Sequence, residues 1–213
     1  MPVGANEMVF KKLFTNAKEP KGRLGRIMAS GMNGGPHERL ARWGMSHFEI
    51  RGDVLDIGCG GGGNISRMLP MKGVTTVKGL DYSEVSVAKS RDVNSAAISE
   101  GRCDITQGNV RDMPFDDESF DTVTAFETVY FWPEIGETFK QVFRVVRPGG
   151  VFAVTNESTG EDKASIKYQK MIDGMNLYTP ERLSELMGCA GFTGMEIFRD
   201  EKKPWITVVG RKG

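Results

Sequence analysis

From Asp53 onward, short apolar runs rich in β-branched residues alternate with stretches whose apolar positions repeat at helical spacing. The runs predict five β-strands, which are DVLDIG, VTTVKGLD, CDITQGN, FDTVTAFE and GVFAVTN. Helices are predicted between them over 63–70, 83–100 and 133–147. Strands that alternate with helices pair in parallel through right-handed crossovers, in a sheet covered on both faces. The pattern therefore predicts an α/β fold.

The two ends of this alternating region follow other patterns. A helix is predicted from Pro36 onward, because proline suits a first helical turn, and a second one from the N-cap Thr179 to Gly191. The final apolar runs, GMEIFRD and WITVVGR, are separated only by EKKP, which predicts an antiparallel hairpin. The stretch 158–178, polar and then rich in Met and Tyr, lies outside the alternation.

The segment VLDIGCGGGGN, residues 54–64, joins the first predicted strand to the first of the intervening helices. Glycines at such a junction let the backbone approach a ligand closely, and N–H groups at the start of the helix face that ligand. The segment contains Gly58-x-Gly60-x-x-Gly63, and Asp81 ends the second strand, where a carboxylate can accept hydrogen bonds from both hydroxyls of a ribose. NAD and other adenosine ligands both satisfy this pattern.

Asp56, two residues before the first of these glycines, distinguishes between adenosine ligands. A fixed negative charge at that point repels a pyrophosphate and attracts an ammonium group. S-adenosylmethionine carries an adenosine, a sulfonium and an ammonium, and it has no phosphate. In addition, no tyrosine of the chain has lysine four residues later, as a short-chain dehydrogenase would require. The sequence therefore favours S-adenosylmethionine over NAD.

Together with KGLDYS, QGNVRDMPFDDESFD and VFRVVRPGG, the glycine segment makes residues 36–213 resemble the class I S-adenosylmethionine-dependent methyltransferases of the small-molecule, type 11 kind. The resemblance implies a Rossmann-like doubly wound sheet of seven strands, ordered 3-2-1-4-5-7-6, with strand 7 antiparallel. It also implies methyl transfer to a small-molecule acceptor by in-line displacement, with S-adenosylhomocysteine as the product. The alternatives are a non-catalytic S-adenosylmethionine-binding protein, an NAD-binding oxidoreductase and a nucleic-acid methyltransferase. Enzymes of the last kind usually show a Pro-Pro-aromatic motif, and no two prolines of this sequence are adjacent.

Carried over by position, the resemblance assigns eight residues to the cofactor: Asp56, Gly58, Cys59, Gly60, Asp81, Tyr82, Asn109 and Val110. Backbone atoms of the three loop residues would line the methionine part, Asp56 would bind the ammonium, and Asp81 would bind the ribose. Tyr82 would pack on the adenine edge, and the Val110 N–H would face the ring. Asn109 stands where the family usually has Asp, and its carbonyl can still accept from the adenine amino group.

Ligands of an open α/β sheet bind beyond the carboxyl ends of its strands, so the ends of the fourth and fifth strands predict the acceptor side. Glu127 and Tyr130 are the catalytic candidates there, with Glu127 as a general base for a protonated acceptor. Tyr130 and Trp132 are expected to form a pocket wall, and Phe131 is expected in the core. Asn156 and His37 are further candidates for contact with the acceptor.

Composition narrows the partners. The 28 basic and 28 acidic side chains cancel, which disfavours nucleic acid as a partner. The three scattered cysteines predict neither a disulfide framework nor a metal site. No apolar run reaches the length of a signal peptide or a membrane span. We therefore expect a cytoplasmic protein without a membrane partner. The basic segment 1–35 is expected to be an N-terminal arm, either a solvated and partly mobile one or a lid that closes over the site.

Overall fold

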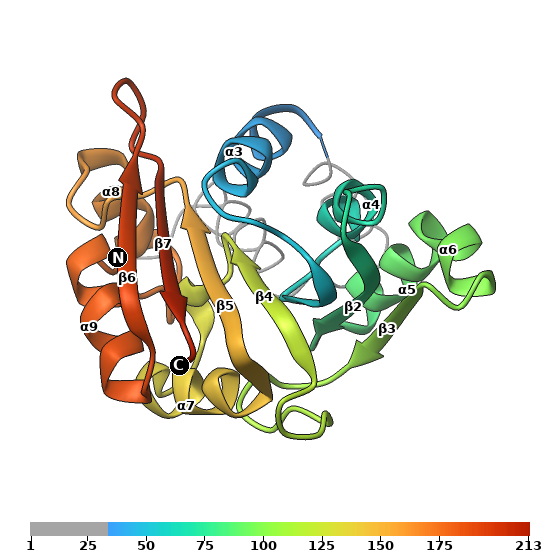
Figure 1. The fold of residues 1–213 in the computed structure, drawn as a ribbon. Helices are drawn as coiled ribbons and strands as arrows, with labels where there is room; N and C mark the ends of the chain where they lie inside the picture. Colours follow the sequence, from blue (N-terminus) through green and yellow to red (C-terminus); the bar gives the residue numbers. More distant parts are fainter. Residues whose placement is uncertain (1–33) are drawn as a thin grey trace, which may run out of the picture.

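In the computed structural model, which describes residues 34–213, seven strands form one sheet in the order β3-β2-β1-β4-β5-β7-β6 (Figure 1). The strands are β1 (Gly52–Ile57), β2 (Val74–Asp81), β3 (Cys103–Gln107), β4 (Phe120–Phe126), β5 (Val146–Asn156), β6 (Thr193–Arg199) and β7 (Ile206–Arg211). Strands β1 to β5 pair in parallel, whereas β7 is antiparallel to both β5 and β6. The predicted fold class, strand order and terminal hairpin are therefore confirmed.

Helices cover both faces of the sheet, as expected for parallel strands that are buried on both sides (Figure 1). They are α3 (Gly35–Met45), α4 (Gly63–Met68), α5 (Glu84–Val93), α6 (Ser95–Ser99), the 3₁₀ turn η1 (Val129–Phe131), α7 (Ile135–Val145), α8 (Lys163–Met171) and α9 (Pro180–Ala190). The apolar sides of α7 and α9 share one core cluster with Phe152, and those of α3, α4 and α5 share a second cluster with Val54. Each large apolar side chain buried in this way contributes about 1.5–3 kcal/mol.

Two predicted helices differ from those observed, each for a local reason. The helix predicted over 83–100 is divided at Asn94, whose side-chain amide donates hydrogen bonds to the carbonyls of Ser90 (2.9 Å) and Gly62 (3.1 Å). The helix predicted over 133–147 begins two residues later, because Glu134 adopts a left-handed conformation with φ 43°. The observed helix also ends two residues earlier than predicted, at Val145, because Val146 and Arg147 already belong to β5.

The stretch 158–178 follows the carboxyl end of β5. It contains α8, which begins where the Asp162 side chain accepts a hydrogen bond from the N–H of Ser165 at 2.9 Å. Near its end, the N–H of Asn176 donates to the carbonyl oxygen of Tyr130 at 2.8 Å. The stretch is thus attached to the turn that follows β4. Residues 1–33 lie outside the described residues, so the N-terminal arm at 1–35 stays a prediction.

Candidate functional site

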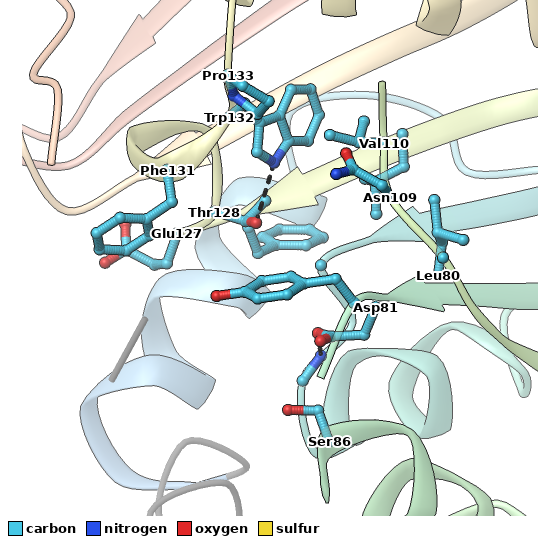
Figure 2. Close-up of a pocket in the computed structure, with 16 residues that line it drawn as sticks. Leu80, Asp81, Ser86, Asn109, Val110, Glu127, Thr128, Phe131, Trp132 and Pro133 are labelled. Atoms are coloured by element: carbon cyan, nitrogen blue, oxygen red, sulfur yellow. Dashed lines mark hydrogen bonds between the residues drawn. The ribbon is translucent and has the colours of Figure 1, made fainter. Parts of the chain in front are cut away.

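A cavity of about 330 Å³ lies at the carboxyl ends of β1, β2 and β4 (Figure 2). The strand order reverses between β1 and β4, and ligands of such sheets bind at this kind of switch point. The volume falls at the lower end of the roughly 300–1,000 Å³ typical of small-molecule sites. The lining includes Gly58, Gly60, Asp81, Tyr82, Ser86, Asn109, Val110, Phe126, Glu127, Thr128, Phe131 and Trp132. Six of the eight predicted cofactor residues and part of the predicted acceptor side therefore share one cavity.

The glycine loop between β1 and α4 needs its glycines for two different reasons. Gly58 has φ 71°, and a Cβ added there would lie 2.2 Å from Oγ1 of Thr128. Gly62 has φ 79°, and its Cβ would lie 2.5 Å from Nδ2 of Asn94. Gly60 also has a positive φ of 53°, but no atom lies within 4 Å of the position its Cβ would take. The loop is packed tightly at its two ends and open at Gly60, where backbone can face a ligand.

Asp81 connects this loop to the end of β2. Its two carboxylate oxygens accept hydrogen bonds from the N–H of Gly60 and the N–H of Ser83, both at 2.9 Å. Burial raises the pKa of Asp81, while the two N–H donors act in the opposite direction. Figure 2 shows its carboxylate at the cavity, near Ser86. Asp81 therefore lies where it can bind a ligand and also hold the glycine loop in place.

On the far side of β2, Asn109 and Val110 line the same cavity. The side-chain carbonyl of Asn109 accepts a hydrogen bond from the N–H of Arg111 at 2.9 Å, which fixes the orientation of the amide. Val110 is buried and belongs to the core cluster beneath the cavity. Tyr82 remains 42% exposed at the rim, so its ring is accessible to a bound ligand.

The two remaining cofactor candidates lie deeper. Asp56 is buried beneath the loop and lines neither cavity described here; Oγ1 of Thr124 donates to its carboxylate at 2.8 Å. Burial raises the pKa of Asp56 to about 7, and the charge of Asp81 adds to this effect. Cys59 lies on a smaller cavity, and burial raises the pKa of its thiol well above the ordinary value. A thiol in that state is a poor nucleophile, in agreement with a packing role.

Glu127 follows β4 directly and adopts a left-handed backbone conformation, with φ 58°. Its N–H donates to the carbonyl of Thr155 at 3.0 Å. Its Oε1 accepts from the hydroxyl of Tyr130 at 3.2 Å and from the N–H of Glu157. Burial, together with the charge of Glu157, raises the pKa of Glu127 to about 8. A carboxyl group with a pKa near the working pH suits general base catalysis.

Glu127 also borders a second cavity, of about 50 Å³, between α3 and the glycine loop. His37 and Leu40 of α3 line this space opposite the loop. Gly58, Gly60 and Phe126 line both cavities, so the two spaces meet at Glu127. The structure thereby brings His37 and Glu127 to one cavity.

The aromatic residues after β4 differ from the sequence prediction. Phe131 lines the larger cavity (Figure 2) instead of lying in the core. Trp132 does line the cavity, but it is buried, stacks on Phe152 with ring centroids 6.4 Å apart, and donates from Nε1 to Oγ1 of Thr128 at 3.1 Å. Tyr130 lines neither cavity and reaches the site through Glu127. The 3₁₀ turn η1 is the reason, because it changes the direction of successive side chains.

Asn156 lies at the end of β5, apart from both cavities. It is fully buried, and neither polar atom of its amide forms a hydrogen bond within the described part of the chain. Most buried amides have partners, so this one marks a place where a water molecule or a ligand group would be stabilised. The structure does not bring Asn156 to the cavity with Glu127.

Several site residues escaped prediction from the sequence. Thr128 packs against Gly58 and orients Trp132, and Asn94 braces Gly62 from a position 32 residues away in the chain. Phe126 and Ser86 line the larger cavity. The position of Thr128 just after a strand end was a usable signal, whereas nothing local to Asn94 indicates its contact with the loop.

Membrane-spanning and metal-binding features are absent from the described residues. Over 34–213, no helix combines the length and apolar character needed to cross a membrane. Within the same range, no group of three or more His, Cys, Asp or Glu side chains is arranged to hold a metal ion.

Comparison with known proteins gives concordant matches. Residues 55–154 match the family model of a methyltransferase domain. Cycloartenol-C-24-methyltransferase 1 of Oryza sativa subsp. japonica is 36% identical over 101 residues, which cover 47% of this chain and 29% of that protein. The chain spans less than half the length of the curated relatives it matches.

Solved structures share the fold at low sequence identity. The methyltransferase bound to the Trm112 activator of Haloferax volcanii superposes with a TM-score of 0.76 at 20% identity, covering 87% of this chain and 93% of that one. Phosphoethanolamine N-methyltransferase 2 of Haemonchus contortus, in complex with phosphomonomethylethanolamine and S-adenosylhomocysteine, gives 0.74 at 16% identity, covering 95% and 60%.

The sheet order and the cavity at its switch point define a Rossmann-like fold of the methyltransferase type. The match of residues 55–154 to the methyltransferase-domain model agrees with this fold and supports the predicted resemblance to class I S-adenosylmethionine-dependent methyltransferases. The resemblance predicted from the sequence is confirmed, and with it S-adenosylmethionine as the cofactor.

Proposed function

We propose that this chain transfers a methyl group from S-adenosylmethionine to a small-molecule acceptor. The observation that carries the proposal is the single cavity with Asp81 and the open glycine loop at one end and Glu127 at the other. The cavity fits the cofactor, because the space above Gly60 is clear and a carboxylate for the ribose lies beside it. When bound, the cofactor supplies an electrophilic methyl group on a sulfonium that is ready to leave.

The chain's own residues bind and orient the two reactants. Asp81 accepts hydrogen bonds from the ribose hydroxyls, Asn109 and Val110 border the adenine, and Tyr82 covers the edge of the adenine ring. The glycine loop contacts the methionine part, and Asp56 stabilises its ammonium through charge from below the loop, because its side chain lines neither cavity. Positioning dominates in such a reaction, since alignment of the reacting groups alone can remove several kcal/mol of the barrier.

On the acceptor side, Glu127 serves as the base and Tyr130 positions its carboxyl group through the 3.2 Å hydrogen bond. The stretch 158–178 borders this side, which its hydrogen bond from Asn176 to Tyr130 supports. A small molecule suits the site better than nucleic acid does, because no lysine or arginine of residues 34–213 lines either cavity. We place the enzyme in the cytoplasm, in agreement with its three free cysteines.

The proposal predicts enzymatic methyl transfer that can be detected before the acceptor is identified. The purified chain should be incubated with S-adenosylmethionine that carries an isotope label on the methyl group, together with pools of small metabolites. Labelled methyl should appear in at least one metabolite, with stoichiometric formation of S-adenosylhomocysteine. Binding of the cofactor without label transfer to any pool would support the non-catalytic binding protein instead.

A further inference from the structure

The lining of the two cavities has an uneven charge. Its carboxylates are Asp81 and Glu127, and within residues 34–213 no lysine or arginine side chain balances them there. At the Asp81 end, two backbone N–H groups already hydrogen-bond to the carboxylate. At the other end, only His37 of the smaller cavity has a side chain that can become cationic. At the acceptor end, no described lysine or arginine therefore pairs with Glu127, so a bound cation would stabilise the ionised form of its carboxyl group.

Glu127 is the carboxyl group that lies where both cavities meet. The charged neighbour that acts on it within the described chain is another carboxylate, Glu157, and burial adds to the cost of ionising it. Aromatic side chains complete the surroundings, because Phe126 and Phe131 line the larger cavity beside Glu127. Carboxylates next to aromatic faces in a partly desolvated space attract cations and repel anions.

We propose that the methyl acceptor is a small amine. The positive charge of the amine pairs with the carboxylate of Glu127, and the aromatic face of Phe131 contacts the same group. The inference rests on the proposed methyl transfer and goes beyond it by naming the chemical class of the acceptor. An acid, a phosphate monoester or another anion is disfavoured at this position, because it would lie against the carboxyl group of Glu127 without a lysine or arginine of residues 34–213 in the lining to pair with it.

The chemistry balances with the groups that are present. The ammonium form of the amine gives one proton to the Glu127 carboxylate, which frees the nitrogen lone pair. That lone pair forms the new C–N bond with the methyl carbon, while the electron pair of the broken C–S bond remains on the sulfur of the cofactor, which becomes a neutral thioether. The positive charge passes from sulfur to nitrogen, so the methylated product leaves as an ammonium, and Glu127 releases its proton to solvent.

Three probes of nearly the same shape separate charge from fit. The chain, saturated with S-adenosylhomocysteine, should be titrated with benzylamine, benzyl alcohol and benzoate, and their dissociation constants measured by ligand-detected NMR. Benzylamine should bind at least about tenfold more tightly than benzoate, with the alcohol between them. In the E127Q variant this order should flatten. Because Glu137 is exposed on α7 and pairs with Lys140, E137Q is a matched control that should keep the wild-type order.

The results that would contradict the amine assignment differ from those that would contradict methyl transfer. Preferential binding of benzoate or of the alcohol, no binding by any of the three probes, or an unchanged order in E127Q would overturn the amine assignment while leaving methyl transfer intact. An affinity for S-adenosylhomocysteine that falls in E127Q as much as the preference for benzylamine would show that Glu127 belongs to the cofactor site. Failure of wild-type protein to bind S-adenosylhomocysteine would overturn the proposed function together with this inference.

Discussion

Replacing Gly58 with alanine should abolish detectable binding of S-adenosylhomocysteine and lower the free energy of unfolding by at least about 2 kcal/mol. A left-handed backbone conformation alone costs an alanine roughly 1–2 kcal/mol. The added Cβ would also lie 2.2 Å from Oγ1 of Thr128, far inside contact distance. Either the loop or Thr128 must move, and the loop is fixed here by the hydrogen bond from the Gly58 N–H to the carbonyl of Leu80 at 2.7 Å.

The natural control is G136A. Gly136 lies in the first turn of α7 with no atom within 4 Å of its Cβ position, so alanine there should raise stability by about 0.5–1 kcal/mol and leave binding unchanged. Denaturant unfolding and isothermal calorimetry measure the two effects. If G58A binds S-adenosylhomocysteine with wild-type affinity, the glycine loop does not contact the cofactor.

Replacing Asp81 with alanine should weaken cofactor binding by about 10- to 150-fold, which corresponds to the roughly 1.5–3 kcal/mol of a hydrogen bond to a charged group. Two effects combine, because the variant loses the acceptor for the ribose and also releases the N–H groups of Gly60 and Ser83. D81N separates them in part, since it keeps the side-chain shape and removes the charge.

N109D is the comparison for this pair of variants. It preserves the side-chain oxygen that accepts from the N–H of Arg111 at 2.9 Å, so the loss of affinity should be below about threefold. Calorimetric titration with S-adenosylhomocysteine gives the constants. Equal losses for D81A and N109D would mean that the adenosine does not lie between Asp81 and Asn109.

The overall fold could be predicted from the sequence because its determinants are local. Apolar runs such as VTTVKGLD and FDTVTAFE mark buried parallel strands, and the four-residue link EKKP fits only a hairpin. The errors lie where a single side chain overrides a pattern. The predicted helix over 83–100 is divided at Asn94, whose side-chain amide donates a hydrogen bond to the carbonyl of Gly62. Helix α7 begins later than predicted because Glu134 has a left-handed backbone conformation. Such long-range or strained features leave little trace in periodicity.

In the candidate site, too, the part set by local sequence could be predicted and the part set by a single turn could not. The cofactor side could be read from spacing, because Gly58, Gly60 and Asp81 belong to one strand–turn–helix pattern and meet at one cavity. The acceptor side could not, because the 3₁₀ turn η1 decides which aromatic ring faces the cavity. It places Phe131 at the lining and leaves Tyr130 to act through Glu127, the reverse of what the sequence predicted for these two residues.

The identity of the bound cofactor tests most directly whether this cavity is a site for S-adenosylmethionine. Thermal unfolding of the purified chain should be measured with S-adenosylmethionine, S-adenosylhomocysteine and NAD in parallel. At a hundredfold excess over the dissociation constant, each of the first two should stabilise the protein by about 2.7 kcal/mol and raise its melting temperature. NAD should leave the melting temperature unchanged. A shift produced by NAD and by neither of the other two ligands would contradict the assignment of this cavity to S-adenosylmethionine.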